Sequence, residues 1–274
     1  MGRVTGESPT QAIEARPHPV VPSQGNGYGV DGGDVVKSTV LRMVAALVFS
    51  GVTTLALVHP TLAAGGWQGV VGSGSPNIRS APTTSAPVVG TLTSGSPIAI
   101  QAWVHGAMVE GVNETWGEIA PGEYVYSANL LKPDPSSPPP APRTFPGHWI
   151  DVNLTQQIIT AYNGSTPAFW AVTSTGAPGW ETVTGTYTIL SRDPNATMSS
   201  ATLTVPVAVP YDLPNVLFTQ YFTDFGEAIH DNYWKGADSP YGVPTSHGCI
   251  GLREAQAKQF WDWAQVGTVV NIHY

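Results

Sequence analysis

Thr245-Ser246-His247-Gly248-Cys249-Ile250 is the stretch that contains the only cysteine of the chain. A lone cysteine is commonly a small buried hydrophobic residue. Here, however, His247 stands two residues before Cys249 and His230 nineteen before it. Imidazole beside thiol is the chemistry of an activated nucleophile, because the thiolate is the reactive form and a nearby imidazolium lowers the thiol pKa. Gly248 has no side chain, which lets backbone amides turn towards a developing oxyanion.

This pattern resembles the signature of the YkuD-type L,D-transpeptidases, in which a histidine precedes a Ser/Thr-His-Gly-Cys tetrad by a gap like the fifteen residues found here. Residues 266–270 also look like the last strand of that family. The resemblance implies that Cys249 is the nucleophile and that His230 is its general base, held by the backbone carbonyl of Asp231. It gives His247 a supporting role.

Composition predicts a folded protein rich in strands and turns. Charged residues make up only 11% of the 274 residues, and the chain has 30 glycines and 25 prolines. This balance favours short strands and many turns over long helices. The net charge of −8 argues against a nucleic-acid partner, which would require a basic face.

The start of the chain is interpreted as a leader. Residues 1–36 are rich in Gly, Pro and polar side chains, which predicts disorder, and they are untranslated if Val35 or Val36 is the true start. Residues 37–64 combine basic residues, an uncharged apolar run and small residues, as in a secretory signal peptide. An uncleaved membrane anchor is the alternative. We therefore expect an extracytoplasmic protein, in the cell wall or anchored in the membrane and facing the wall.

Residues 67–132 alternate short β-prone runs with Gly and Pro turns, the pattern of a small barrel. Asn77-Ile78-Arg79-Ser80-Ala81-Pro82 and Trp116-Gly117 resemble bacterial Src-homology-3-like domains. That resemblance implies a module that binds or spaces the cell wall, with a purely structural appendage as the alternative. Residues 133–146 contain seven prolines and predict a semi-rigid linker, so a fragment of residues 146–274 is expected to fold alone.

Residues 147–274 are predicted to form the catalytic domain. Apolar residues recur with a period of two up to an Asn163-Gly164 turn, which predicts an antiparallel meander. Ser174-Thr175-Gly176 and Thr184-Gly185-Thr186-Tyr187 resemble two further family segments, and one helix is predicted over Arg253–Ala264. The chain is thus predicted to be mainly β: a small Src-homology-3-like barrel, a Pro-rich linker and a YkuD-like β-sandwich or barrel with one late helix.

Several residues near the tetrad are candidates for supporting roles. Ser246 is predicted to hydrogen-bond locally, and Asp231 is either an orienting residue or a solvated loop carboxylate. Tyr221, Tyr233 and Trp234 are candidates for lining a groove that binds peptide. Aromatic residues beside a strand pack against a core at least as often, so this second interpretation stays open.

One position departs from the family pattern. Family members commonly carry Asn or Arg two residues beyond the cysteine, and here that residue is Gly251. If the strand continues, Arg253 lies on the same side as Cys249 and Gly251, because strand side chains repeat every two residues. Arg253 is therefore a candidate for supplying the missing cation to the substrate.

Together these features predict an exported peptidoglycan L,D-transpeptidase, a transferase that cross-links or remodels the cell wall and so affects cell shape. An L,D-carboxypeptidase of the same fold and a non-catalytic wall-binding protein are the alternatives. A zinc site of His230, His247 and Cys249 is chemically allowed, but the usual ligand spacings are missing. No metal and no cofactor is predicted. The expected partners are peptidoglycan stem peptides and, for the barrel, the wall polymer, with the protein itself a monomer.

Overall fold

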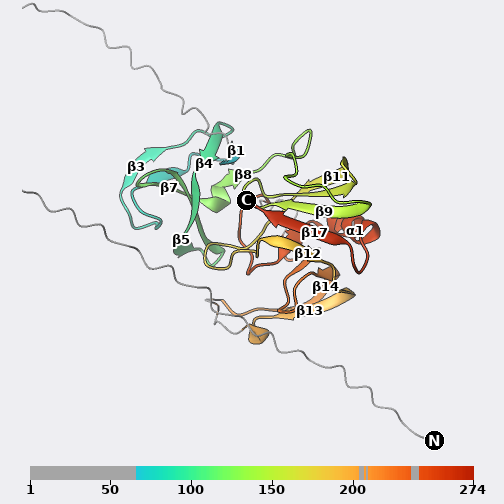
Figure 1. Cartoon of the computed structure of the whole chain (residues 1–274). Helices are drawn as coiled ribbons and strands as arrows, with labels where there is room; N and C mark the ends of the chain where they lie inside the picture. Colours follow the sequence, from blue (N-terminus) through green and yellow to red (C-terminus); the bar gives the residue numbers. More distant parts are fainter. Residues whose placement is uncertain (1–65, 204–206, 208, 236–240) are drawn as a thin grey trace, which may run out of the picture. The chain divides into compact units, whose positions relative to one another are not determined.

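A computed structural model describes residues 66–203, 207, 209–235 and 241–274 (Figure 1). The predicted leader, residues 1–36 and 37–64, lies outside these ranges. All described residues belong to one compact unit. Within it, no helix combines the length and the apolar composition needed to cross a membrane. The described chain is mainly β, as predicted.

The first sheet of the C-terminal region contains the predicted meander. Its three strands follow one another along the chain and pair antiparallel. Strand β17 then pairs parallel with β9, and β12 pairs antiparallel with β17 at the edge of the sheet. The order is therefore β11-β10-β9-β17-β12. The strands are β9 (His148–Asn153), β10 (Ile158–Asn163), β11 (Thr166–Val172), β12 (Gly185–Thr188) and β17 (Val269–His273).

The second sheet of this region has the order β13-β14-β15-β16. Its first three strands are antiparallel, whereas β15 and β16 are parallel, so a connection of some length separates these two in sequence. That connection ends in the Ser-His-Gly-Cys tetrad. The strands are β13 (Ser191–Ser199), β14 (Asp212–Tyr221), β15 (Ala228–Asp231) and β16 (Ile250–Leu252), and a short 3-10 turn, η2 (Ser200–Thr202), follows β13.

The late helix is confirmed. Helix α1 spans Glu254–Trp263, with Arg253 and Ala264 as its flanking caps. Phe260 is fully buried in the core that both sheets share, because the apolar stripe of the helix faces them. Trp261 stacks under the Arg192 guanidinium, whose central carbon lies 3.6 Å from the ring centre.

The last strand begins later than predicted. The sequence places it at residues 266–270, but β17 begins at Val269. Gly267 has φ +91°, a conformation that glycine adopts easily, and it forms a turn in which Val266 is 62% exposed. The predicted start of this strand was therefore wrong, because Val266 is apolar but belongs to the turn.

The N-terminal region forms two small sheets, which fit the small β-domain predicted for residues 67–132. Its assignment to the Src-homology-3-like class stays a prediction. A three-stranded sheet has the order β4-β1-β8, and a five-stranded sheet has the order β3-β2-β7-β6-β5. The elements are β1 (Trp67–Val71), β2 (Asn77–Arg79), β3 (Val88–Thr91), β4 (Pro97–Ile100), β5 (Ala102–Val109), β6 (Asn113–Ala120), β7 (Glu123–Tyr126), η1 (Ser127–Asn129) and β8 (Leu130–Leu131).

The N-terminal sheets hold the segment that leads into the tetrad. Val243 is 1% exposed and belongs to the same hydrophobic cluster as Trp67. Trp67 Nε1 donates to the carbonyl of Gly242, and Thr115 Oγ1 donates to the carbonyl of Pro244 at 2.8 Å. A fragment of residues 146–274 would lose these contacts. Its independent folding stays a prediction.

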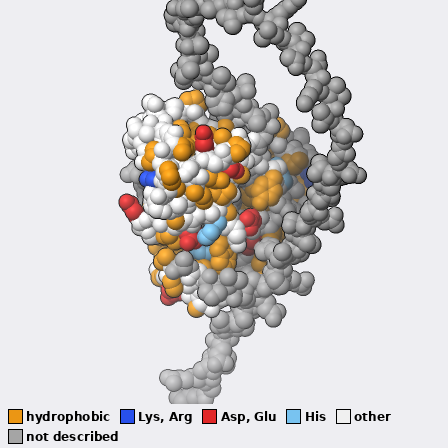
Figure 2. All heavy atoms as spheres, turned by 90° about the vertical axis from the view of Figure 1, so that its left-hand side faces the viewer, with side chains coloured by type: hydrophobic (Ala, Val, Ile, Leu, Met, Phe, Trp, Pro, Cys, Tyr) orange, Lys and Arg blue, Asp and Glu red, His pale blue; other side chains and the backbone are white. Residues whose placement is uncertain are grey.

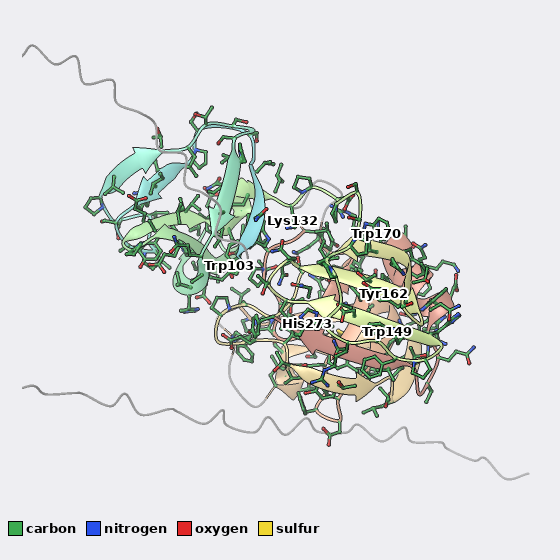
Figure 3. All side chains as sticks on the ribbon, turned by 45° about the horizontal axis from the view of Figure 1, so that its top comes forward. Trp103, Lys132, Trp149, Tyr162, Trp170 and His273 are labelled. Carbon is green, nitrogen blue, oxygen red and sulfur yellow. The ribbon has the colours of Figure 1, made fainter. Side chains whose placement is uncertain are left out.

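The proline-rich linker is in contact with the meander rather than free of it. Figure 3 shows Trp149, Tyr162 and Trp170 on the three strands β9, β10 and β11. Trp170 Nε1 donates to the carbonyl of Pro135 at 2.9 Å, and Phe145 meets the Trp149 ring edge-on at 5.1 Å. The linker therefore covers aromatic side chains that would otherwise face water.

We predict that Trp67→Phe loosens the segment that leads into the tetrad, because phenylalanine lacks the N–H that donates to the Gly242 carbonyl. Removal of one buried hydrogen bond should cost about 1–3 kcal/mol of unfolding free energy. Trp116→Phe is a matched control, since Trp116 is equally buried but donates to Ala107 within the N-terminal sheets. Chemical denaturation should show similar losses, while the rate at which iodoacetamide alkylates Cys249 in the folded protein should fall only for Trp67→Phe. Equal alkylation rates in both variants would show that the hydrogen bond from Trp67 does not hold the tetrad segment in place.

Candidate active site

The parallel pair β15–β16 brings the two motif segments together. Its register joins Ile229 with Ile250 and His230 with Gly251. Neighbouring residues in register project to the same face of a sheet, and so do alternate residues along one strand. His230 therefore lies on the face of Gly251 and of Cys249, which directly precedes β16. The structure thus places the predicted base and the predicted nucleophile on one face.

His230 is held in one tautomer. Its side chain is 3% exposed, and Nδ1 lies 2.6 Å from the carbonyl oxygen of Asp231. A carbonyl only accepts, so Nδ1 carries the proton and Nε2 keeps a free lone pair. Burial lowers the pKa of His230 to about 4, against the opposing effect of the hydrogen bond to Asp231. The imidazole is therefore neutral at physiological pH and able to accept a proton.

Asp231 is not a solvated loop carboxylate. It is 0% exposed, and its Oδ1 accepts the Leu217 N–H at 2.5 Å. Burial raises the pKa of its carboxyl, partly offset by this hydrogen bond. The carboxylate thus ties β15 to β14, while the main-chain carbonyl orients His230 as the family resemblance implies.

The Cys249 thiol rests in its protonated form. Sγ donates to the carbonyl of Gly226 at 3.8 Å, and the residue is half-buried. Burial raises the pKa of Cys249 to about 12; the Ala228 amide lowers it and the Glu227 carboxyl raises it further. This direction is opposite to the lowered pKa that the sequence suggested. The physical reason is desolvation, which penalises the thiolate and the imidazolium alike.

The loop before the thiol is fixed by its own hydrogen bonds. Ser246 Oγ donates to the carbonyl of Cys249 at 2.6 Å and accepts the Gly248 N–H at 3.2 Å, which confirms its predicted local role. Gly248 has φ +113°, and a Cβ there would lie 2.8 Å from Glu227 Oε1, so only glycine fits. Thr182 Oγ1 donates to the Gly248 carbonyl at 2.6 Å. In this arrangement the Gly248 amide is not free to bind an oxyanion, in contrast to the prediction.

The Ser174-Thr175-Gly176 segment, which resembles a family segment, frames this loop. Ser174 and Gly251 exchange two backbone hydrogen bonds of 3.0 and 2.8 Å. The Thr175 carbonyl accepts the amides of Thr245 and Ser246 at 2.9 and 3.0 Å. The segment thereby adds a third piece of backbone to the β15–β16 edge.

His247 lies among aromatic side chains. It is exposed, with the Trp180 ring edge-on at 4.9 Å and the Tyr211 ring at 5.4 Å. Although the residue is exposed overall, the side chains packed around its ring desolvate it and lower its pKa, with Glu114 of the N-terminal sheets opposing. Sequence reasoning missed Trp180 and Tyr211, since neither has a motif spacing to Cys249. A supporting role for His247 agrees with these contacts.

The predicted groove aromatics fall into two groups. Tyr221 ends β14 next to Ala228, and its pKa is raised by burial and by the nearby Cys249. The Trp234 ring lies 5.7 Å from the His230 ring and is 40% exposed. Tyr233 is held apart by a hydrogen bond from its hydroxyl to Pro214. Tyr221 and Trp234 therefore flank the site, and Tyr233 supports Trp234 from outside.

Glu227 is a buried carboxyl that the sequence reasoning did not single out. Its Oε2 accepts the Val183 N–H at 3.3 Å, and Oε1 borders Gly248. Burial raises the pKa of Glu227 to about 8, with the Val183 hydrogen bond opposing. The sequence signal that could have indicated a buried carboxyl here is an acidic residue directly before the apolar start of β15.

Arg253 has an aromatic partner beside the site. Its guanidinium lies over the Tyr241 ring at 4.5 Å, and Lys235 Nζ lies over the same ring at 4.9 Å. Lys235 also donates to Ser174 Oγ and Thr245 Oγ1, each at 3.1 Å, and burial lowers its pKa to about 8. Contact of Arg253 with a substrate stays a prediction.

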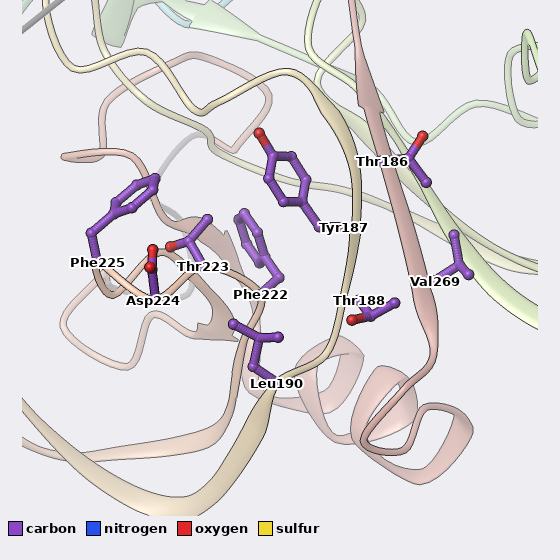
Figure 4. A pocket seen from close by; sticks show the side chains of 9 residues that line it. All are labelled: Thr186, Tyr187, Thr188, Leu190, Phe222, Thr223, Asp224, Phe225 and Val269. Carbon is purple, nitrogen blue, oxygen red and sulfur yellow. The ribbon is translucent and has the colours of Figure 1, made fainter. Parts of the chain in front are cut away.

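Phe225 lines a groove, and the next residue, Gly226, is the one whose carbonyl accepts the Cys249 thiol. The volume of the groove is about 440 Å³ (Figure 4). Tyr187 and Phe222 face each other in it with ring centres 5.9 Å apart, while Thr223, Asp224 and Phe225 follow on one loop. The groove is thus mainly apolar with one carboxylate, Asp224, on its exposed side. No three His, Cys, Asp or Glu side chains converge in a way that would hold a metal ion in the described part of the chain.

Comparison with known proteins gives one family. Residues 147–272 match the profile of YkuD, the L,D-transpeptidase catalytic domain. The probable L,D-transpeptidase 3 of Mycobacterium tuberculosis is 27% identical over 151 residues, which cover 54% of this chain and 49% of that protein. The chain therefore spans about half the length of this curated relative.

The solved structures that resemble this chain are also named L,D-transpeptidases. An L,D-transpeptidase from Mycobacterium smegmatis has 19% identity and a TM-score of 0.44, with 64% of this chain and 83% of that chain covered. L,D-transpeptidase 3 from Mycobacterium tuberculosis has 22% identity and a TM-score of 0.42, with coverage of 47% and 62%.

We predict that His230→Ala slows the alkylation of Cys249 by about a hundredfold or more, because the neutral thiol loses its proton acceptor. His247→Ala should slow it far less, since this ring contacts Trp180 and Tyr211. The measurement is the rate of iodoacetamide alkylation against pH, followed by intact mass. The reverse ranking would assign the base to His247.

We further predict that Glu227→Gln changes the pH dependence of the thiol. The carboxyl ionises as the pH rises past about 8, and its charge then raises the pKa of Cys249. The glutamine side chain of the variant has nearly the same shape and stays neutral at every pH, so it does not raise the pKa of Cys249 in this way. Alkylation should therefore be faster in Glu227→Gln than in the wild type above about pH 8, and equal below about pH 7.

The same carboxyl should make stability depend on pH. Its folded pKa of about 8 exceeds the ordinary value of 4.5, so the folded state binds the proton more tightly. The contribution of Glu227 to the stability of the wild type should be largest below that ordinary value and be lost as the pH rises to about 8. Urea denaturation should therefore show that the unfolding free energy of the wild type, taken relative to that of Glu227→Gln, falls over this window; an identical pH dependence in both proteins would contradict the assignment.

Proposed function

Because residues 147–272 belong to the YkuD family of L,D-transpeptidase catalytic domains, we propose that the protein is an exported peptidoglycan L,D-transpeptidase with Cys249 as its nucleophile. The observation that carries this proposal is the β15–β16 register, which sets Cys249 and His230 on one face. The hydrogen bond from His230 Nδ1 to the Asp231 carbonyl adds support, because it leaves Nε2 as the acceptor.

The first half-reaction forms a thioester. Cys249 Sγ attacks the carbonyl carbon on the L-centre side of an L,D-peptide bond, while its proton passes to His230 Nε2. The resting pair is neutral, so this proton moves during the attack rather than before it. The C–N bond then breaks, and His230 returns the proton to the departing amine of D-alanine.

The second half-reaction transfers the acyl group. An acceptor amine attacks the thioester carbon and gives its proton to His230; the C–S bond breaks, and the proton returns to the thiol. A second stem peptide as acceptor gives a cross-link. Water as acceptor gives the alternative product of an L,D-carboxypeptidase.

Oxyanion stabilisation requires a change in the loop. The Gly248 N–H rests on Ser246 Oγ at 3.2 Å, a long hydrogen bond. Ser246 is anchored separately by its bond to the Cys249 carbonyl. Release of the Gly248 amide towards a developing oxyanion therefore leaves the Ser246 hydroxyl with a partner.

The surroundings of the thiol suit a peptide. Tyr221 and Trp234 flank the reacting face, and the apolar groove of Figure 4 includes Phe225, which directly precedes Gly226, the residue whose carbonyl accepts the thiol. Peptide grooves in proteins are mostly apolar with a few polar groups that set orientation. We therefore assign the stem peptide to this groove, with Arg253 as the candidate partner for a substrate carboxylate.

The N-terminal sheets are proposed to face the cell-wall polymer. Figure 2 shows hydrophobic side chains gathered on one face, with few Lys or Arg groups. Val88 and Val89 of β3 and Val112 after β5 are each more than half exposed. Figure 2 also shows Asp and Glu groups on this face, which together with the few cations make it a poor match for an anionic polymer and leave the glycan as the proposed contact. Export itself rests on the signal-like composition of residues 37–64.

We predict that purified protein converts disaccharide-tetrapeptides into cross-linked dimers with release of D-alanine. Cys249→Ala should abolish this turnover and also the covalent adduct that intact mass detects with a carbapenem. Its melting temperature should stay close to that of the wild type, which separates lost chemistry from lost folding. Turnover retained in Cys249→Ala would overturn the proposal, and monomeric tripeptide as the only product would identify the carboxypeptidase.

A further inference from the structure

Asn232 fills the space in which a side chain at position 251 would project. Gly251 pairs with His230 in the β15–β16 register. A Cβ at Gly251 would overlap Asn232 Nδ2 and would lie 2.6 Å from Asn232 Cγ and Oδ1. Non-bonded atoms do not approach this closely, so a side chain at 251 and the present Asn232 side chain exclude each other. The two positions share one place on the sheet.

This shared place lies on the reacting face. The Asn232 amide donates to the Leu252 carbonyl at 2.8 Å, so the parallel pairing continues past the end of β15. Asn232 stands two residues after His230, and alternate residues of an extended strand share a face. Asn232 therefore joins His230 and Cys249. The neighbouring strand supplies the polar group that the family pattern puts two residues beyond the cysteine.

The Asn232 main chain is held in place, but its side chain is not satisfied. It is 5% exposed, and its Oδ1 has no hydrogen-bond partner within the described ranges. Its main chain is fixed at both ends, because the carbonyl also accepts the Lys235 N–H at 2.9 Å. A buried amide oxygen without a partner is unfavourable in a folded protein. A donor from a bound molecule would remove that penalty.

We propose that Asn232 is a substrate-contacting residue whose Oδ1 accepts a backbone N–H of the acyl-donor peptide. It thereby takes the place that residue 251 has in the family pattern. The inference rests on the proposed acyl transfer at Cys249. It explains why glycine occupies position 251 without loss of a polar group beside the thiol.

Three variants test the contact and the exchange. Asn232→Leu keeps the side-chain size but removes both polar atoms, whereas Asn232→Asp keeps the acceptor. Gly251→Asn adds a side chain to a filled place, and the double variant N232G/G251N returns the amide from the other strand. Each is measured for kcat and KM with a stem tetrapeptide, for iodoacetamide alkylation of Cys249, and for melting temperature.

We expect Asn232→Leu to lose about tenfold in kcat/KM, as for one hydrogen bond to substrate, with the alkylation rate unchanged. Asn232→Asp should lose less. Gly251→Asn should lose more than either because of the overlap, and the double variant should recover to within about threefold of the wild type.

Two results would overturn the inference. Full kcat/KM in Asn232→Leu would make Asn232 a space-filling residue only. A double variant no better than Gly251→Asn would show that the two positions do not exchange. Wild-type protein that alkylates normally but never turns over the tetrapeptide would instead defeat the proposed function, and the inference with it.

Discussion

The pairing of two short parallel strands is the constraint on which the site depends. The β15–β16 register, from Ile229 opposite Ile250 to Asp231 opposite Leu252, sets His230 beside the strand that follows Cys249. A slip of one residue would turn His230 to the opposite face. The register is fixed because Ile229 and Ile250 are fully buried in the core shared by both sheets. Packing of apolar residues thus fixes the geometry of the polar ones.

A second constraint comes from the other half of the chain. The loop that carries the tetrad enters through Val243, whose side chain belongs to the hydrophobic cluster of the N-terminal sheets. Trp67 and Thr115 bind the carbonyls on either side of it. The N-terminal sheets therefore help to build the site, in addition to any contact they make with the wall. A cell-wall ligand bound there would act on the same elements that hold the loop.

The parts predicted from the sequence were those with a local chemical pattern. Cys249, His230 and the carbonyl of Asp231 follow from a motif, and the late helix follows from its apolar spacing. Glu227 and Asn232 were missed because their roles arise from contacts across strands: one borders Gly248 and the other fills the space of Gly251. The thiol pKa was predicted in the wrong direction for a related reason. Nearby charge can be read from a sequence, whereas desolvation depends on the complete fold.

In the proposed function, the nucleophile is held as a neutral thiol on the same face as a neutral imidazole, and proton transfer accompanies attack on the substrate. The most direct measurement is the ultraviolet absorbance of the thiolate in the wild type, with Cys249→Ala as the reference, titrated from about pH 5 to about pH 10. The account predicts no thiolate signal below about pH 9, because burial places the pKa of Cys249 at about 12. A thiolate step near neutral pH that disappears in His230→Ala would contradict it and would show a preformed ion pair.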